Sequence, residues 1–84
     1  MIHELKILPE YFDAIVEGRK TFEVRRNNRA YVVGDMLALK EWNEREQVYT
    51  GRSCDVRITY VLDSKDYCKE GYVILGIKLT ETFE

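Results

Sequence analysis

Basic side chains are concentrated in one short stretch of an otherwise acidic chain. Residues 19–29 carry +4, from five cations and the single acid Glu23. The five cations are Arg19, Lys20, Arg25, Arg26 and Arg29. Since the whole chain carries −2, the other residues carry −6. This distribution favours a specific site that attracts an anionic ligand over nonspecific coating of a polyanion, and a salt-bridged surface strand is the alternative.

Residues 20–26 alternate in polarity, as a strand with one buried face does. Phe22 and Val24 share one face, whereas Glu23 and Arg25 share the other. The pattern predicts that Phe22 and Val24 are buried and that Glu23 and Arg25 lie on the opposite, polar face of the strand. On an ordinary solvated strand the same Glu and Arg would only pair with each other.

The chemistry of these side chains suits a nucleic acid or a nucleotide. Lysine and arginine bind phosphates, and a glutamate accepts hydrogen bonds from an exocyclic amine of cytosine or guanine. The predicted binding residues are Lys6, Lys20, Glu23, Arg25, Arg26 and Arg29. An aromatic ring would supply stacking, and the candidates are Tyr11, Tyr31, Trp42, Tyr49 and Tyr67. Single-stranded RNA is favoured as the polymer because no recognition helix for a DNA groove is apparent.

The elements that must position these residues are five strands and one helix. The strands are predicted over residues 2–8, 20–26, 36–42, 54–60 and 72–79, with a bulge or bend at 49–52 and a polar loop at 63–71. A helix begins at Pro9 and ends at Gly18, which takes the left-handed C-terminal position without steric cost. The fold class is therefore mainly β with one helix near the N-terminus, best closed as a small β-barrel.

Composition bounds the class of protein. Eighty-four residues, 45% hydrophobic and 33% charged, suit a single folded domain over residues 1–84. Since the longest apolar stretch is only a few residues, we expect a soluble cytoplasmic protein with no membrane contact. Cys54 and Cys68 are expected to be unpaired, and His3 to be a core-edge residue rather than a base. With one histidine and two distant cysteines, we predict no metal site and no cofactor.

Several segments resemble a known family. They are HELKILPEYF at residues 3–12, GRKTFEVRRNNR at 18–29, VGDMLALKEW at 33–42, YTGR at 49–52 and GYVILGIKL at 71–79. The stretch from Gly18 through Lys20 to Glu23 resembles the G-x-K-x-x-E element of ASCH domains of the PUA-like superfamily. The chain resembles more closely a short bacterial and phage family of unknown function, DUF3850. The resemblance implies a PUA-like barrel with a cleft beside the first helix, and binding of RNA or a modified nucleoside. It also implies that Lys20 lies at the mouth of the cleft, with Glu23 and Arg25 inside.

A second interpretation is a small amidohydrolase. Some similar PUA-like proteins remove the acetyl group of a modified cytidine with a lysine, a threonine three residues later and a distant glutamate. Lys20 matches that lysine, but Glu23 stands at the threonine position and Thr21 has the wrong spacing. The distant glutamate has no secure counterpart, although Glu41 and Glu70 are available. Glu23 could instead act as a general base with Lys20 as the oxyanion partner.

A third interpretation is a protein-interaction module that keeps only the barrel.

Overall fold

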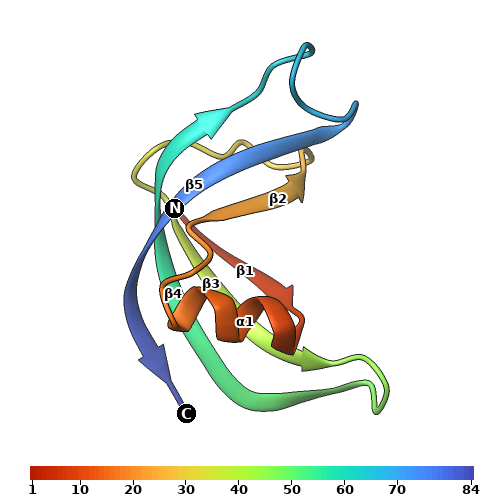
Figure 1. Ribbon diagram of the computed structural model, residues 1–84, viewed down its shortest axis with the longest axis vertical. Coiled ribbons are helices and arrows are strands. Elements are labelled where there is room, and N and C mark those ends of the chain that lie inside the picture. The colour runs from red at the N-terminus through yellow and green to blue at the C-terminus, as the bar shows by residue number, and fades with distance from the viewer.

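The alternating segments of the chain form one five-stranded sheet in the computed structural model, which describes residues 1–84 (Figure 1). The strands are β1 (Ile2–Ile7), β2 (Phe22–Arg26), β3 (Met36–Asn43), β4 (Val48–Leu62) and β5 (Tyr72–Phe83). One helix, α1 (Pro9–Val16), follows β1. The predicted fold class, mainly β with one helix near the N-terminus, is therefore confirmed. No helix of the chain is long and apolar enough to cross a bilayer.

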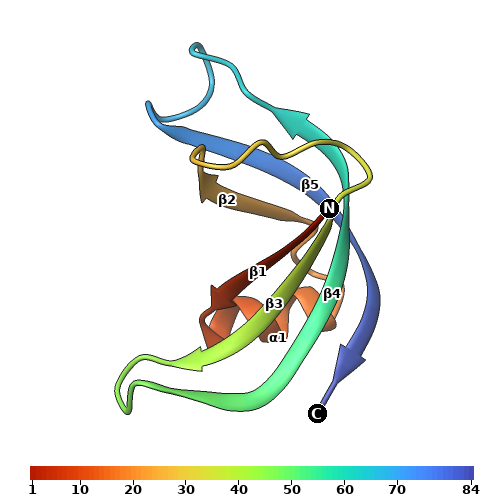
Figure 2. The same cartoon turned by 180° about the vertical axis from the view of Figure 1, so that it is seen from behind.

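The strand order in the sheet is β1-β3-β4-β5-β2. The pairing of β1 with β3 is parallel, and the other pairings are antiparallel. The sheet curls into a half-barrel with long, bent β4 and β5 at its back (Figure 2). Consequently β1 and β2, which are 15 residues apart in the chain between Ile7 and Phe22, form the two outer edges of the sheet.

Helix α1 covers part of the inner face of the curled sheet and contacts β3, β4 and β5. Phe12 and Ile15, three residues apart on one face of the helix, are almost fully buried there. The helix stops because Gly18 adopts a φ of 82°, and the amides of Arg19 and Lys20 both donate to the carbonyl oxygen of Ala14. The buried apolar core consists of Ile7, Phe12, Ile15, Tyr31, Leu37, Leu39, Cys54, Val56, Ile58, Val73, Leu75 and Ile77.

The predicted bend at residues 49–52 is a bulge in β4. Trp42 pairs with Tyr49, whereas Lys40 pairs with Ser53, so β4 carries extra residues opposite Glu41. Gly51 within the bulge has a φ of 96°, a conformation that favours glycine. The last strand is longer than predicted, because residues 81–83 continue to pair with β4, although the side chains of residues 80–84 are exposed.

The predicted burial of Phe22 and Val24 is wrong. Their side chains are about half exposed, at 48% and 50%. Glu23 pairs with Leu75 and Arg25 with Val73, and both of these β5 residues are buried in the core. Since paired residues point to the same face of a sheet, Glu23 and Arg25 occupy the inner face of β2. Phe22 and Val24 lie on the outer face of an edge strand, which α1 does not cover.

Candidate functional site

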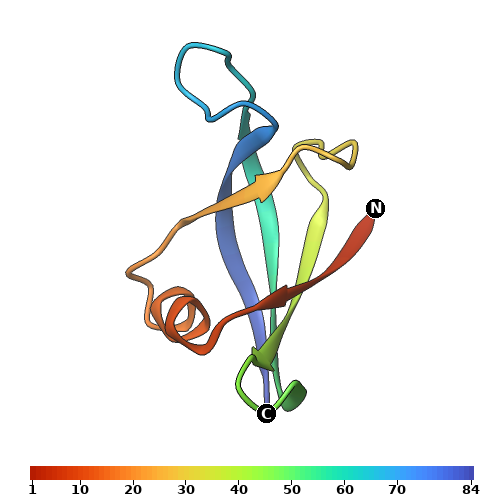
Figure 3. The same cartoon turned by 90° about the vertical axis from the view of Figure 1, so that its right-hand side faces the viewer.

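A cleft of about 450 Å³ opens where the end of β1, the start of α1 and the edge strand β2 meet. Figure 3 shows β1 and β2 as separate strands with α1 beside them. The cleft is lined by Lys6, Ile7, Leu8, Tyr11, Lys20, Phe22, Glu23, Val24 and Arg25. Four of the six predicted binding residues, Lys6, Lys20, Glu23 and Arg25, therefore lie together.

Glu23 is the buried acid of this cleft, with a residue exposure of only 4%. One of its carboxylate oxygens accepts a hydrogen bond from Nζ of Lys20, and the other accepts one from Nε of Arg25 at 2.7 Å. Both cations are themselves mostly buried, with side-chain exposures of 15% for Lys20 and 20% for Arg25. A buried charge needs such partners, because leaving it unpaired is strongly destabilising.

Arg25 also links the two open edges of the sheet. Its Nη2 donates a hydrogen bond to the carbonyl oxygen of Lys6 at 2.9 Å, although β1 and β2 have no backbone pairing with each other. The two edge strands of the half-barrel are therefore joined here by a side chain. A ladder of backbone hydrogen bonds between them would have closed the sheet without an opening. One guanidinium group therefore bridges β1 and β2 at the cleft.

Lys20 is held in place by the end of the helix. The left-handed turn at Gly18 directs the chain back toward β2, and Nζ of Lys20 donates to the carbonyl oxygen of Phe22 at 2.6 Å. The same ammonium lies 5.5 Å from the ring centre of Tyr11 and 5.0 Å from that of Phe22. Two aromatic rings thus flank the lysine, within the range of cation–π attraction.

The balance of charge in the cleft is positive. Lys6, Lys20 and Arg25 are three cations around the single carboxylate of Glu23, which leaves +2. Nζ of Lys6 has no acidic partner and lies 3.8 Å from the ring centre of Trp42. The cleft therefore combines uncompensated positive charge with an apolar lining, which suits a ligand that is part anionic and part aromatic.

Comparison with known proteins gives the family. The model described as "Domain of unknown function (DUF3850)" matches residues 2–77. The chain belongs to the DUF3850 family. It is also 46% identical over 74 residues to the "Uncharacterized 12.9 kDa protein in GpA 3'region" of Escherichia phage P2. The matched region is 88% of this chain but 65% of the phage protein, so the chain spans less than two thirds of that relative.

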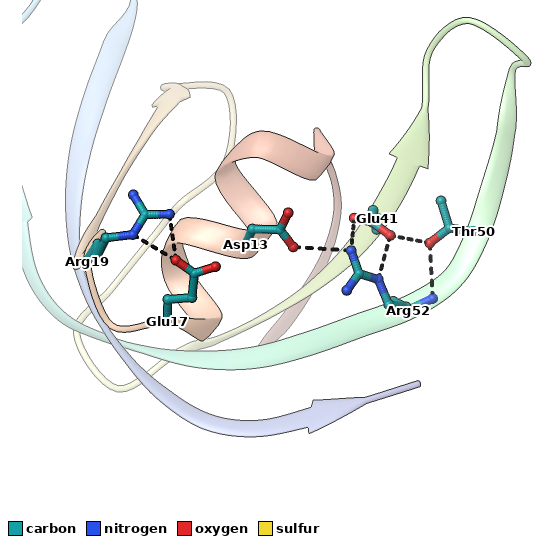
Figure 4. A network of polar contacts seen from close by, with 6 residues as sticks. All are labelled: Asp13, Glu17, Arg19, Glu41, Thr50 and Arg52. Atoms are coloured by element: carbon teal, nitrogen blue, oxygen red, sulfur yellow. Dashed lines mark hydrogen bonds and ion pairs between the residues drawn. The ribbon is translucent and has the colours of Figure 1, made fainter.

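Within this DUF3850 chain, two predicted binding residues lie outside the cleft. Arg26 is exposed on the outer face of β2, and its guanidinium lies 5.6 Å from the ring centre of Tyr72. Arg29 is exposed in the segment that joins β2 to β3. Arg19, which contributes to the basic stretch, pairs with Glu17 at 2.7 Å and does not line the cleft (Figure 4). The basic stretch of the sequence is therefore divided by the fold.

The apolar half of the lining did not emerge from the sequence as part of a site. The alternating pattern predicts Phe22 and Val24 for the core, and it places residues 7 and 8 only at the end of the first strand. Leu8 stands directly before Pro9, where the chain leaves β1 for α1. A residue between a strand and a helix belongs to neither packed element, and this position is the sequence signal for its place in the cleft lining. Tyr11 is the only one of the five predicted stacking residues in the cleft.

A second buried glutamate, Glu41, lies away from the cleft. Its carboxylate accepts hydrogen bonds from Nε and Nη2 of Arg52 at 2.9 and 2.6 Å and from Oγ1 of Thr50 at 2.5 Å (Figure 4). These hydrogen bonds, chiefly those from Arg52, hold the pKa of Glu41 below its usual value. Nη2 of Arg52 also reaches Asp13 of α1 at 3.2 Å. The network ties the bulge of β4 to the helix.

His3 is buried, as predicted, and its Nε2 lies 2.9 Å from a carboxylate oxygen of Asp35. The hydrogen bond with His3 is the largest cause that lowers the pKa of Asp35 to about 2. The amide of Val32 also donates to Asp35, at 3.2 Å. Because His3 is in β1 and Asp35 directly precedes β3, this pair fixes the start of β1 against β3. Neither residue lines the cleft.

Both cysteines are free thiols. Cys54 is buried in the core, and that burial raises the pKa of its thiol to about 11. Cys68 donates from Sγ to the carbonyl oxygen of Leu62 at 3.3 Å in the turn before β5. A thiol with so high a pKa is a poor nucleophile, so Cys54 has a packing role.

Proposed function

We propose that this protein binds a nucleotide, alone or within single-stranded RNA, in the cleft between β1 and β2. The observation that carries the proposal is the gathering of three cations, two half-exposed aromatic rings and one buried carboxylate in a single cleft of about 450 Å³. That volume lies within the roughly 300 to 1,000 Å³ of typical small-ligand sites. The combination matches the three parts of a nucleotide: phosphate, base face and base edge.

The phosphate would be bound by Lys6 and Arg25. Lys6 has no acidic partner, so its ammonium is free to approach an anion. Arg25 uses Nε for Glu23 and Nη2 for the Lys6 carbonyl, and a guanidinium has further N–H donors beyond these two. Charge-assisted hydrogen bonds from such groups are the usual means of phosphate recognition in proteins.

The base would stack on Tyr11 or Phe22, whose residues are 44% and 48% exposed. Stacking of a base on an aromatic ring contributes about 1–3 kcal/mol and tolerates any base, because every base has a π face. Glu23 would read the base edge, because a carboxylate has about four acceptor sites and its two known partners leave the others free. A base with an exocyclic amine would therefore be preferred.

We further propose that the DUF3850 fold is an ASCH-type, PUA-like barrel. Two features support this assignment. The order of elements is strand, helix and four strands in a curled sheet. The cleft is walled by the first helix and by the G-x-K-x-x-E stretch from Gly18 to Glu23, as the ASCH resemblance implies.

A second candidate function is hydrolysis of an acylated cytidine. It is suggested by the ion pair between Lys20 and the buried Glu23. Three observations weigh against it. Thr21 does not line the cleft, and neither do Glu41 and Glu70. Moreover, both oxygens of Glu23 already accept hydrogen bonds from cations, which opposes their taking a proton from water. Binding without turnover is therefore the better supported function.

The test is the binding of a fluorescently labelled, mixed-sequence oligoribonucleotide, measured by polarisation as salt is raised. In an oligonucleotide the three cations of the cleft, Lys6, Lys20 and Arg25, would contact about three phosphates. This gives a slope of log affinity against log salt of roughly −2 for a single strand. Lys20→Met and Arg25→Gln should each weaken binding about tenfold, since a hydrogen bond to a charged group contributes about 1.5–3 kcal/mol. Arg57→Gln is the matched control, because Arg57 is exposed on β4 and does not line the cleft.

Glu23→Gln separates binding from catalysis. A binding protein should keep its phosphate affinity and change its base preference, whereas a hydrolase should lose turnover of N4-acetylcytidine with binding largely intact. Absence of any RNA or nucleotide binding at low salt would overturn the proposal. If amidase activity were also absent, a protein-interaction role would remain.

A further inference from the structure

A second hollow adjoins the cleft on the other side of the end of β1. Its volume is about 350 Å³. It is lined by Lys6, Ile7, Leu8, Trp42, Glu44 and Gln47. Since Lys6, Ile7 and Leu8 also line the cleft, the two hollows share one wall, and a ligand that fills the first can continue into the second.

Trp42 supplies an aromatic surface in this second hollow. It is partly exposed, and Tyr49 supports it edge-on, with ring centres 4.8 Å apart and an interplanar angle of 73°. The ammonium of Lys6 lies 3.8 Å from the Trp42 ring centre. The indole is thus held in position by one neighbour and covered by a flexible, solvent-exposed cation, which an incoming base can displace.

From this arrangement we infer a second nucleotide subsite, in which a base stacks on Trp42 and Lys6 binds the phosphate that joins it to the nucleotide in the cleft. The inference rests on the proposed function and deepens it. Lys6 is suited to the linking phosphate because it is the one cation that lines both hollows. The preferred ligand is then an oligonucleotide of at least two residues rather than a free mononucleotide.

The edge of the second base would meet Glu44. Three hydrogen bonds order the hairpin that carries Glu44. Nε2 of Gln47 donates to the Glu44 carbonyl at 2.7 Å, the amide of Glu46 donates to Oδ1 of Asn43 at 3.0 Å, and Nδ2 of Asn43 donates to Oε1 of Glu46 at 3.0 Å. The Glu44 carboxylate has no cationic partner among the ion pairs of the chain, so it is free to accept a hydrogen bond from a base amine. Cytosine is therefore a suitable base for the test.

The test compares cytidine monophosphate with the dinucleotide CpC by titration calorimetry. The dinucleotide should bind roughly tenfold more tightly or better, from one additional stacked base. Electrostatics alone would favour the opposite order, because the monophosphate carries up to about −2 and the single phosphodiester carries −1. Trp42 is the only tryptophan of the chain. Stacking of the second base should therefore change its fluorescence beyond any change that the monophosphate causes by drawing Lys6 away from the ring.

Trp42→Leu should reduce the ratio of the two affinities to near one. Tyr67→Leu is the control, because Tyr67 is an exposed loop residue that lines neither hollow, and it should leave the ratio unchanged. If the monophosphate binds but the dinucleotide gains nothing, or if Trp42→Leu keeps the full gain, the second subsite is wrong while the cleft proposal survives. If neither ligand binds, both proposals fail.

Discussion

Glu23 and Glu41 are both almost wholly buried, and each accepts hydrogen bonds from an arginine, yet their surroundings differ. Arg52, the partner of Glu41, is also bound to Asp13 and stacks over the Phe12 ring at 4.6 Å. The partners of Glu23 are Lys20 and Arg25, and both line an open cleft.

The difference separates a structural ion pair from a candidate binding site. Burial and pairing are common to both glutamates, so neither property by itself indicates function. Arg52 also borders a hollow, of about 360 Å³, but the two cations there, Arg52 and Lys40, both pair with carboxylates. What distinguishes the Glu23 cluster is a third cation, Lys6, which lines its cleft without an acidic partner. In the Glu41 cluster, by contrast, Thr50 and Arg52 donate hydrogen bonds to Glu41, and Arg52 also donates to Asp13, so the cluster joins the β4 bulge to the helix.

The largest expected effect is on stability, from Arg52→Met. The substitution leaves the Glu41 carboxylate buried without its cation, and breaking a buried pair in this way costs about 3 kcal/mol or more. Urea denaturation followed by circular dichroism measures the loss. Arg45→Met is the control, because Arg45 is exposed in the β3–β4 hairpin and should change stability by less than about 0.5 kcal/mol. A loss of under about 1 kcal/mol for Arg52→Met would place the pair among weak surface ion pairs.

The next largest effect is on the affinity for RNA, and it is tested by comparing two neighbouring arginines of β2. Arg25→Ala should weaken RNA binding about tenfold, because Arg25 faces the cleft and would donate charged hydrogen bonds to the ligand. Arg26→Ala should change affinity only about twofold, because Arg26 lies on the outer face, where salt screens its charge. Both are measured by polarisation at the same salt concentration. Equal losses for the two variants would mean that the ligand follows the basic sequence and not the cleft.

Acid should reveal the structural carboxylates. The folded pKa of Asp35 is about 2, below its ordinary 3.8, so its contribution to stability is complete above about pH 4 and is lost as the pH falls toward 2. Glu41 acts in the same direction, because Arg52 lowers its pKa. The free energy of unfolding should therefore fall between pH 4 and 2. Asp35→Asn should lower stability at pH 7 and flatten this dependence, and an unchanged slope in that variant would contradict the assignment.

Much of the fold follows from local patterns in the sequence. The helix between Pro9 and Gly18, strand β3 and the bulge near Gly51 are set by neighbouring residues, and each was predicted. The strand order was not predictable in this way, because the parallel pairing of β1 with β3 joins segments about 34 residues apart, such as Ile2 and Met36. Long-range pairing of this kind leaves no periodicity in the sequence.

The site was predictable in its chemistry and not in its geometry. Lys20, Glu23 and Arg25 were found from the motif, but the bond from Arg25 to the carbonyl of Lys6 depends on two strands meeting at the open edges of the curl. Glu41 did carry a usable signal, because it shares the parity of the buried Leu37 and Leu39. A charged residue on the apolar face of a strand predicts a buried ion pair.

The smallest expected effect tests the corrected orientation of β2. Val24 and Val73 lie on paired strands, but Val24 is 50% exposed on the outer face and Val73 is 1% exposed in the core. Val→Thr replaces a methyl group with a hydroxyl of nearly the same size, so the cost depends on whether that hydroxyl is buried without a partner. Val73→Thr should lower the free energy of unfolding by about 1–3 kcal/mol, whereas Val24→Thr should change it by less than about 0.5 kcal/mol. Urea titration of the two variants side by side measures both values. A comparable loss in Val24→Thr would mean that Phe22 and Val24 face the core. Glu23 and Arg25 would then lie on the outer face of β2, and the assigned orientation of the strand would be wrong.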